Sequence, residues 1–181
     1  MQPKDSPMVD PIQEFNVPIV SSAHLAAGAM PALSEFEFGA IIVSHAFDRW
    51  MVRCMAAAGV PDMSPIDVLV LHSVYHRNKP KRMADICLVL NIEDTHVVSY
   101  AIKKLARLKL VVSHKQGKEK LIAVTATGAR ACQRYHEIRE ALLVRSVGTI
   151  GIDQQSLSRI AAQMRALSGH YDQAARAAAS L

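Results

Sequence analysis

The segment from Lys81 to Thr125 constrains the fold of this chain more than any other part of it. It reads as a short apolar helix, a tight turn, and a second helix that begins near Asp94 and has one polar, basic face. Two β-prone runs follow, Leu110–Ser113 and Leu121–Val124, and residues 114–120 between them supply a glycine-containing hairpin tip. This order predicts a helix-turn-helix with a wing, an arrangement whose second helix fits the DNA major groove.

Apolar residues at helical spacing predict further helices on both sides of this segment. One begins after Ser34 and ends near Ala58, and the next covers about 65–77. Beyond the wing, Thr125 and Asp153 are good caps for two more helices. The chain is 50% hydrophobic but only 5% aromatic, a composition that also favours helices. The expected fold class is mainly α with a small β-hairpin wing and with dimerisation helices towards both termini.

These elements divide the chain into four expected segments. Residues 1–33 hold five of the eight prolines and form an irregular N-terminal arm, with a short helical turn around 22–30. Residues 34–60 form a dimerisation and support helix, and residues 61–125 form the winged helix-turn-helix lobe. Residues 126–181 form the C-terminal dimerisation helices.

The last helix, which follows a joint at Gly148–Gly151, carries an apolar stripe with alternating spacings of three and four. A heptad-like stripe of this length needs a partner helix. The stripe could pack on its own domain, but that domain already has core helices, so we expect a seam between two copies of the chain. The residues of this dimerisation stripe are Leu157, Ile160, Met164, Leu167 and Tyr171.

The positive charge of the chain is concentrated in the winged segment. Between Arg77 and Lys120 there are eleven lysines and arginines against four acidic residues, although the whole chain carries a net charge of only +5. An ordinary solvated surface would carry a similar number of acids among the bases. Basic charge gathered on one element is typical of phosphate binding, so this pattern favours double-stranded DNA as the partner.

Three groups of side chains in this segment could contact DNA. The outer face of the second helix would read base edges and phosphates through Thr95, His96, Ser99, Tyr100, Lys103 and Lys104. The wing tip would reach the flanking minor groove through Lys115, Lys118 and Lys120. The start of the first helix would clamp the DNA backbone through Lys79, Lys81 and Arg82.

The run MADICLVLNIEDTHVVSYAIKKLARLKLVV, residues 83–112, resembles the winged helix-turn-helix of the MarR (multiple antibiotic resistance regulator) transcription factors. The later VTATG looks like the LTxxG that opens the fifth helix in that family, and the order of helices and strands is similar from Ser34 to the C-terminus. The resemblance implies an obligate homodimer with interlocked terminal helices. It also implies two winged lobes that lie on successive major grooves.

The chain departs from the family pattern in the wing. The family usually carries Asp-x-Arg there, and these positions fall on Gln116 and Lys118. A lysine lacks the planar fork of arginine, so we expect minor-groove readout to be weaker or displaced onto Lys115 or Lys120. The family also often has a glycine before the first wing strand, where this chain has Lys109.

Members of the resembled family often respond to small aromatic or acidic ligands in a crevice between the dimer helices and the winged lobe. In this chain the resemblance implies an effector pocket lined in part by His45, Trp50 and Cys54. Trp50 is equally consistent with plain core packing.

Two alternatives come from other residues or other functions. His72 and His76 are four apart on one helix and could bind zinc, but no carboxylate stands at a matching position, so a metal-responsive regulator is a weaker alternative. The cysteines Cys54, Cys87 and Cys132 form no CxxC pair and indicate neither a zinc site nor a disulfide framework. A winged helix can also serve as a protein-interaction module that does not bind DNA.

The sequence contains no glycine-rich phosphate loop, GxSxG or HExxH motif, so we expect neither catalysis nor a cofactor. No apolar run approaches the roughly 18 residues that span a bilayer, and the first residues lack a signal sequence. The expected protein is a cytoplasmic homodimer that regulates transcription by binding a pseudo-palindromic duplex site and that responds to a small molecule. The two half-sites should lie about 10 bp apart.

Overall fold

The computed structural model describes residues 18–117 and 119–181, which fall into two compact units that meet between Arg49 and Trp50. The first unit holds the short 3-10 helix η1 (Ala23–Ala26) and the part of helix α1 (Pro31–Ala57) up to Arg49. The helical turn expected around 22–30 is therefore confirmed.

Helix α1 begins at Pro31, three residues before the position expected from the sequence. Proline suits the first helical position because its missing N–H would have no partner there. Ser34 lies buried inside the helix, and its hydroxyl donates to the carbonyl of Leu25 at 2.7 Å. The backbone N–H of Ile19 donates to Oε1 of Glu35 at 3.0 Å, so both contacts tie the preceding segment to the first turns of α1.

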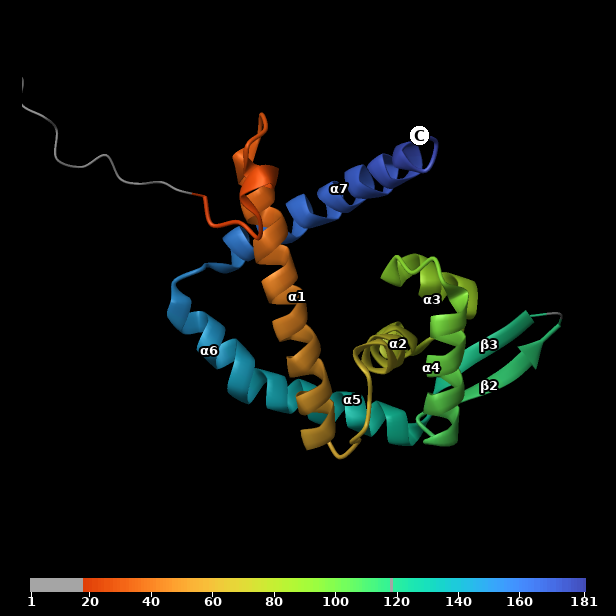
Figure 1. Cartoon of the computed structure of the whole chain (residues 1–181). Coiled ribbons are helices and arrows are strands. Elements are labelled where there is room, and N and C mark those ends of the chain that lie inside the picture. Colours follow the sequence, from red (N-terminus) through yellow and green to blue (C-terminus); the bar gives the residue numbers. More distant parts are fainter. Residues whose placement is uncertain (1–17, 118) are drawn as a thin grey trace, which may run out of the picture. The chain divides into compact units, whose positions relative to one another are not determined.

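The second unit contains the winged lobe (Figure 1). Its helices are α2 (Pro65–Tyr75), α3 (Met83–Leu90), α4 (Thr95–Arg107) and α5 (Ala126–Arg139), and its strands are β1 (Lys81–Arg82), β2 (Val111–Gln116) and β3 (Glu119–Val124). The strands form an antiparallel sheet in the order β1-β3-β2, and the β2–β3 hairpin stands beside α4 (Figure 1). The expected fold class, mainly α with a small β wing, is confirmed, while dimerisation through the terminal helices stays a prediction.

The sheet has one strand more than the sequence analysis expects. Lys81 and Arg82 pair with Ile122 and Leu121 of β3. Two basic residues are too short a run to show an alternating β pattern, so the expectation that a helix begins at Lys81 was wrong, and α3 begins at Met83. The hairpin tip is also shorter than expected, because pairing continues out to Gln116 and Glu119.

Local caps set the helix boundaries. Ser64 and Asp67 form a capping box at the start of α2, with Pro65 in the first turn. Asp94 accepts a hydrogen bond from the N–H of His96 at the start of α4, and Thr125 accepts one from Gly128 at the start of α5. These three starts agree with the sequence analysis, because a cap is a signal carried by neighbouring residues.

One hydrophobic core holds the second unit together. It joins the C-terminal part of α1 to α2, α3, α4, α5 and the sheet. Its buried side chains come from every one of these elements except β1, and they include Met55, Leu71, Ile86, Leu105, Ile122 and Cys132.

Helix α5 continues through a π-helical turn, η3 (Glu140–Val144), into α6 (Arg145–Val147). The short helix η4 (Gly148–Ile150) and Gly151, whose φ of 73° is left-handed, form the expected joint. Asp153 then caps α7 (Gln154–Ala178) by accepting a hydrogen bond from Ser156 N–H at 2.9 Å. Within the described ranges, no helix combines the length and the hydropathy that a membrane crossing requires.

Candidate nucleic-acid interface

Helix α4 has one buried face and one exposed polar face. Val98, Ala101, Ile102 and Leu105 are buried and hold the helix on the core. On the opposite side, the Tyr100 side chain is 70% exposed. Its ring lies 5.4 Å from Nζ of Lys103, a cation-π distance that keeps the two side chains together on the surface. The outer face expected from the sequence therefore exists as an exposed polar surface.

The polar residues of this face differ in how far they reach into solvent. Thr95, His96, Tyr100 and Lys103 are exposed, whereas Ser99 is half-buried. Ser99 therefore carries its hydroxyl at the edge of the exposed face. Such a hydroxyl can donate to or accept from a base edge or a phosphate oxygen.

A hollow of about 240 Å³ lies where α4 meets the sheet. Lys103 of α4 and Lys120 of the wing both line it, together with Ser99 and apolar side chains. Lysine side chains that border such a hollow place positive charge where α4 and the wing face the same partner. The lining residues are Met83, Ser99, Ile102, Lys103, Lys120 and Ile122.

The wing carries like charges directly across its ladder. Lys115 of β2 stands opposite Lys120 of β3, and both residues are exposed. Like charges at opposed positions destabilise an antiparallel pair. An anion bound over the wing would therefore reduce the repulsion between these two lysines. Lys118, also expected at the wing tip, lies outside the described residues.

Lys104 does not share the exposed face with Lys103. Its Nζ lies 2.7 Å from Oδ2 of Asp67, and it also donates to the carbonyl of Asp62. Burial by itself would raise the pKa of the Asp67 carboxyl, but the hydrogen bonds from Lys104 and Ser64 outweigh it and leave that pKa lowered. The structure thus places Lys104 between α4 and α2, away from the surface on which the sequence analysis grouped it.

Lys81 and Arg82 also have partners within the chain. Nζ of Lys81 donates to the carbonyls of Val74, His76 and Lys79. The guanidinium of Arg82 pairs with Asp85 at 2.8 Å and with Glu119 at 3.2 Å. These contacts join the end of α2, the first turn of α3 and the wing, so both residues position the lobe, whereas the sequence analysis expected them on the DNA backbone.

The residues expected to line an effector pocket lie in different surroundings. His45 is exposed in the first unit. In the second unit, Trp50 packs against the core, and Cys54 is 2% exposed with its thiol donating to the carbonyl of Tyr135 at 3.6 Å. Burial is the main reason that the pKa of the Cys54 thiol is raised. None of the three is among the described residues that line the larger pocket of the lobe.

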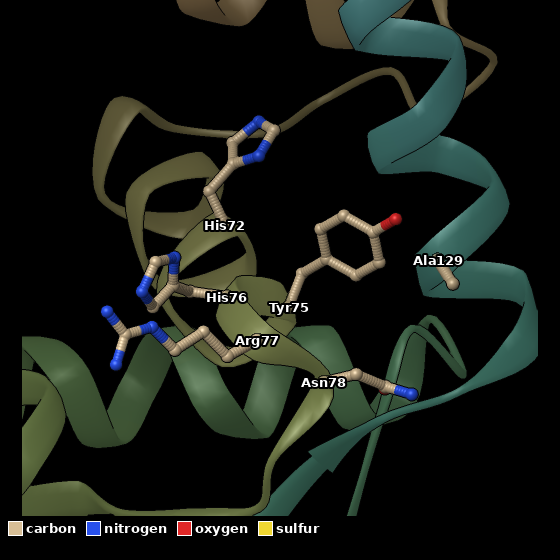
Figure 2. Close-up of a pocket in the computed structure, with 6 residues that line it drawn as sticks. All are labelled: His72, Tyr75, His76, Arg77, Asn78 and Ala129. Atoms are coloured by element: carbon tan, nitrogen blue, oxygen red, sulfur yellow. The ribbon is translucent and has the colours of Figure 1, made fainter.

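That larger pocket, of about 730 Å³, lies at the C-terminal end of α2 (Figure 2). Figure 2 shows His76 and Arg77 extending in the same direction, while Tyr75 and Asn78 lie towards Ala129 of α5. The sequence analysis counted Arg77 in the basic segment and did not expect Arg77 and Asn78 to line a pocket. The available signal was the asparagine itself, which tolerates the left-handed backbone that a turn beyond a helix end requires.

The two histidines of the metal alternative differ in environment. The His72 ring is mostly buried and meets the Tyr135 ring edge-on at a centroid distance of 4.6 Å, and burial lowers the pKa of His72. His76 is exposed. No group of three or more His, Cys, Asp or Glu residues within ranges 18–117 and 119–181 is arranged to hold a metal ion. A metal response through this pair stays a prediction.

These features define a winged-helix protein, and residues 63–128 match the winged helix DNA-binding domain family. The fold of the chain is that of the MarR family of transcriptional regulators. A MarR family regulator from Neisseria meningitidis superposes with a TM-score of 0.64 and 16% identity, over 79% of this chain and 95% of that one. The resemblance drawn from residues 83–112 is confirmed.

Two further solved structures of this fold carry ligands. Reduced AbfR bound to DNA gives a TM-score of 0.61 at 16% identity, over 78% of this chain and 96% of that one; AbfR is a protein of Staphylococcus epidermidis. CouR from Rhodococcus jostii bound to p-coumaroyl-CoA gives a TM-score of 0.58 at 15% identity, over 73% of this chain and 90% of that one. At these identities the likeness establishes the fold. No curated protein sequence matches the chain significantly.

Proposed function

We propose that the chain is a sequence-specific, double-stranded DNA-binding regulator of transcription that acts as a homodimer on a pseudo-palindromic site and responds to a small molecule. The observation that carries the proposal is the hollow that Ser99 and Lys103 of α4 share with Lys120 of β3. A recognition helix and a wing that border one hollow with lysine side chains can hold a duplex in a fixed register.

The proposal divides the contacts between two surfaces. The outer face of α4 reads base edges through side chains with hydrogen-bonding groups, namely the exposed Thr95, His96, Tyr100 and Lys103 and the half-buried Ser99. Lys115 and Lys120 of the wing, with Lys118, supply charge for the DNA backbone and the minor groove. Lys104 is left out of both surfaces because Asp67 and Asp62 hold its ammonium group.

Helix α7 supports the homodimer. None of its residues, all of which are described, is buried. Leu157, Ile160 and Met164 are each at least 40% exposed along the three-four stripe. An apolar stripe of this length on an exposed helix is stabilised by a second helix, so we propose that α7 and α7 of a second copy help to form the dimer. The two winged lobes of the dimer would then bind half-sites about 10 bp apart.

The pocket at the end of α2 supports a small-molecule response. Its volume of about 730 Å³ lies in the range that holds a drug-sized ligand. CouR, a protein of the same fold, binds p-coumaroyl-CoA. Binding and release of DNA and effector account for the whole proposed function, so no enzymatic step is assigned to the chain.

One observation favours the protein-interaction alternative. Leu88 and Val89 at the end of α3 are 80% and 73% exposed, an apolar pair that could dock on another protein. The salt dependence of binding separates the two functions, because each phosphate contact releases counterions from DNA. A protein-docking module would bind duplex negligibly even at low salt.

The proposal is tested by selecting bound duplexes from a random pool with the full chain. We expect enrichment of a sequence with two related half-sites whose centres lie about 10 bp apart. A pool that stays random after several rounds at low salt would contradict sequence-specific binding. Enrichment of a single half-site, bound by one copy, would contradict the homodimer while leaving DNA recognition intact.

A further inference from the structure

The outer face of α4 carries a large, mostly apolar ring among polar side chains. The side chain of Tyr100 is 70% exposed, although a tyrosine ring usually buries most of its surface. The residues beside it on this face, His96 and Lys103, are exposed as well and are polar. The ring therefore lies on the surface that the proposed function places against DNA.

Val97 is also exposed, by 38%, but it lies on a different flank of α4. It precedes Lys104 by seven residues, which is two helical turns, so the two side chains share one side of the helix. That side faces α2, because the ammonium group of Lys104 lies 2.7 Å from the carboxylate of Asp67. The apolar surface of the outer face thus comes from the Tyr100 ring.

Lys103 fixes the place where this apolar surface can act. Its Nζ lies 5.4 Å from the centre of the Tyr100 ring, a cation-π contact between residues three apart on the helix. An ammonium group has three donors, so a lysine beside a ring still has N–H groups for an acceptor. Two side chains held together in this way contact neighbouring bases, because successive base pairs are about 3.4 Å apart.

The major groove offers such a ring one kind of apolar partner. Base edges present hydrogen-bond donors and acceptors there, and the exception is the C5-methyl group of thymine. Cytosine carries the same group when it is methylated at C5. Guanine presents two acceptors, N7 and O6, which suit a lysine.

We propose that Tyr100 and Lys103 together read two adjacent base pairs, with a pyrimidine C5-methyl group against the Tyr100 ring and a guanine against Lys103. The inference rests on the proposed function, because it requires the outer face of α4 to enter the major groove. It adds to that function the bases that each half-site contains. The ring makes the contact with the methyl group, and the hydroxyl of Tyr100 has no part in it.

The methyl contact is tested on a duplex that the full chain selects from a random pool. Each thymine of one half-site is replaced in turn by deoxyuridine, which lacks only the C5-methyl group. We expect one position at which wild-type affinity falls about fourfold, the effect of removing one buried methyl group. Tyr100→Ala should not respond to deoxyuridine at that position, whereas Tyr100→Phe, which keeps the ring, should respond as the wild type does.

Val97→Ala is the matched control for this comparison. It also removes apolar surface from α4, but on the side that faces α2, so it should respond to deoxyuridine as the wild type does. Both residues are exposed, so these substitutions should leave the fold intact. A deoxyuridine effect that persists in Tyr100→Ala would overturn the ring contact.

The guanine contact is tested with 7-deazaguanine, which lacks the N7 acceptor, at each guanine of the same half-site. We expect wild-type affinity to fall about fivefold at one guanine, on a base pair next to the sensitive pyrimidine. Lys103→Ala should show no loss at that guanine. An undiminished loss in Lys103→Ala, or sensitive positions more than one base pair apart, would overturn the reading of two adjacent base pairs.

A second selection, from a pool whose cytosines all carry C5-methyl groups, identifies the source of the methyl group. The same thymine in both selections identifies thymine. A methylcytosine at this position, found only in the second selection, identifies 5-methylcytosine, and unmodified cytosine then takes the place of deoxyuridine in the comparison of variants.

These outcomes separate the inference from the proposed function. A duplex that is selected and bound, but whose affinity does not depend on any C5-methyl group, would leave sequence-specific binding intact and overturn the inference. A chain that selects no duplex would contradict the proposed function, and the inference would fail with it.

Discussion

Lys104 Nζ and Asp67 Oδ2 are 2.7 Å apart and connect the recognition helix to the first turn of α2. The Asp67 side chain is 4% exposed and the Lys104 side chain 29%, so this is a largely buried ion pair. The same carboxylate accepts a hydrogen bond from the N–H of Ser64 in the capping box. One residue earlier on α4, Lys103 is exposed, so the two adjacent lysines differ: Lys104 fixes the helix and Lys103 faces solvent.

Lys104→Met should destabilise the lobe by about 1–3 kcal/mol, because it leaves the Asp67 carboxylate buried without its ion-pair partner. Urea unfolding at pH 7 measures the change. Lys103→Met is the matched control, and we expect it to stay within about 0.5 kcal/mol of the wild type because Lys103 is exposed. Equal stability of Lys104→Met and the wild type would show that the ion pair contributes nothing.

The pH dependence of the same pair has a definite sign. The pKa of Asp67 is lowered below its ordinary value of 3.8 in the folded chain, despite burial that acts in the other direction. The resulting stabilisation is fully present above 3.8 and is lost as the pH falls through the lower folded value. Lys104→Met removes the main cause of the lowering, so its stability deficit should shrink at pH 3 relative to pH 7.

Much of this architecture could be predicted from the sequence because its signals are local. Ser64, Asp94, Thr125 and Asp153 lie within three residues of the N–H groups that they cap. The partner of Lys104 lies 37 residues away in sequence, and nothing next to either residue indicates the other. The exposed face of α4 could therefore be predicted from periodicity, but not which of its two lysines points inward.

The pairing of β1 with the wing could not be predicted from the sequence for the same reason. β1 is two basic residues long, and its pairing with β3 depends on a chain that returns about 40 residues later. The sequence analysis therefore interpreted Lys81 and Arg82 as DNA contacts, since a basic pair before a helix looks the same in either role.

Lys120→Thr should weaken duplex binding and slightly stabilise the free protein. The substitution removes the repulsion between Lys120 and Lys115 across the ladder and adds a good strand former, a gain of up to about 1 kcal/mol. Loss of one phosphate contact should lower the slope of log affinity against log salt by about one. Thermal unfolding and salt titrations measure the two effects, and a destabilised protein would contradict the repulsion.

Gly128→Ala should cost about 3 kcal/mol or more, because the new Cβ would press on the backbone carbonyl oxygen of Leu110 and lie 2.9 Å from Cγ2 of Val124. Gly128 lies in the first turn of α5 and packs directly on the turn between α4 and β2 and on the end of β3. Gly148→Ala is the control, since its Cβ would meet nothing within 4 Å. We expect that control to keep or slightly raise the unfolding free energy, and equal effects of both substitutions would contradict the close packing.

The double variant Ile160→Asp, Met164→Asp should be monomeric at micromolar concentration where the wild type is dimeric, because two charges would be buried in the α7 seam. Sedimentation velocity measures the mass. Ser158→Asp, on an exposed position off the stripe, should remain dimeric. A dimeric double variant would place the interface elsewhere, and a monomeric wild type would contradict the homodimer.

The most direct test of the central claim, that the outer face of α4 reads base sequence, is the affinity of Lys103→Ala for a selected duplex and for a scrambled duplex over a range of salt. We expect the ratio of the two affinities to fall about tenfold, equivalent to about 1.4 kcal/mol of discrimination, while Lys120→Thr lowers both affinities alike. Equal loss on both duplexes for Lys103→Ala would contradict the claim.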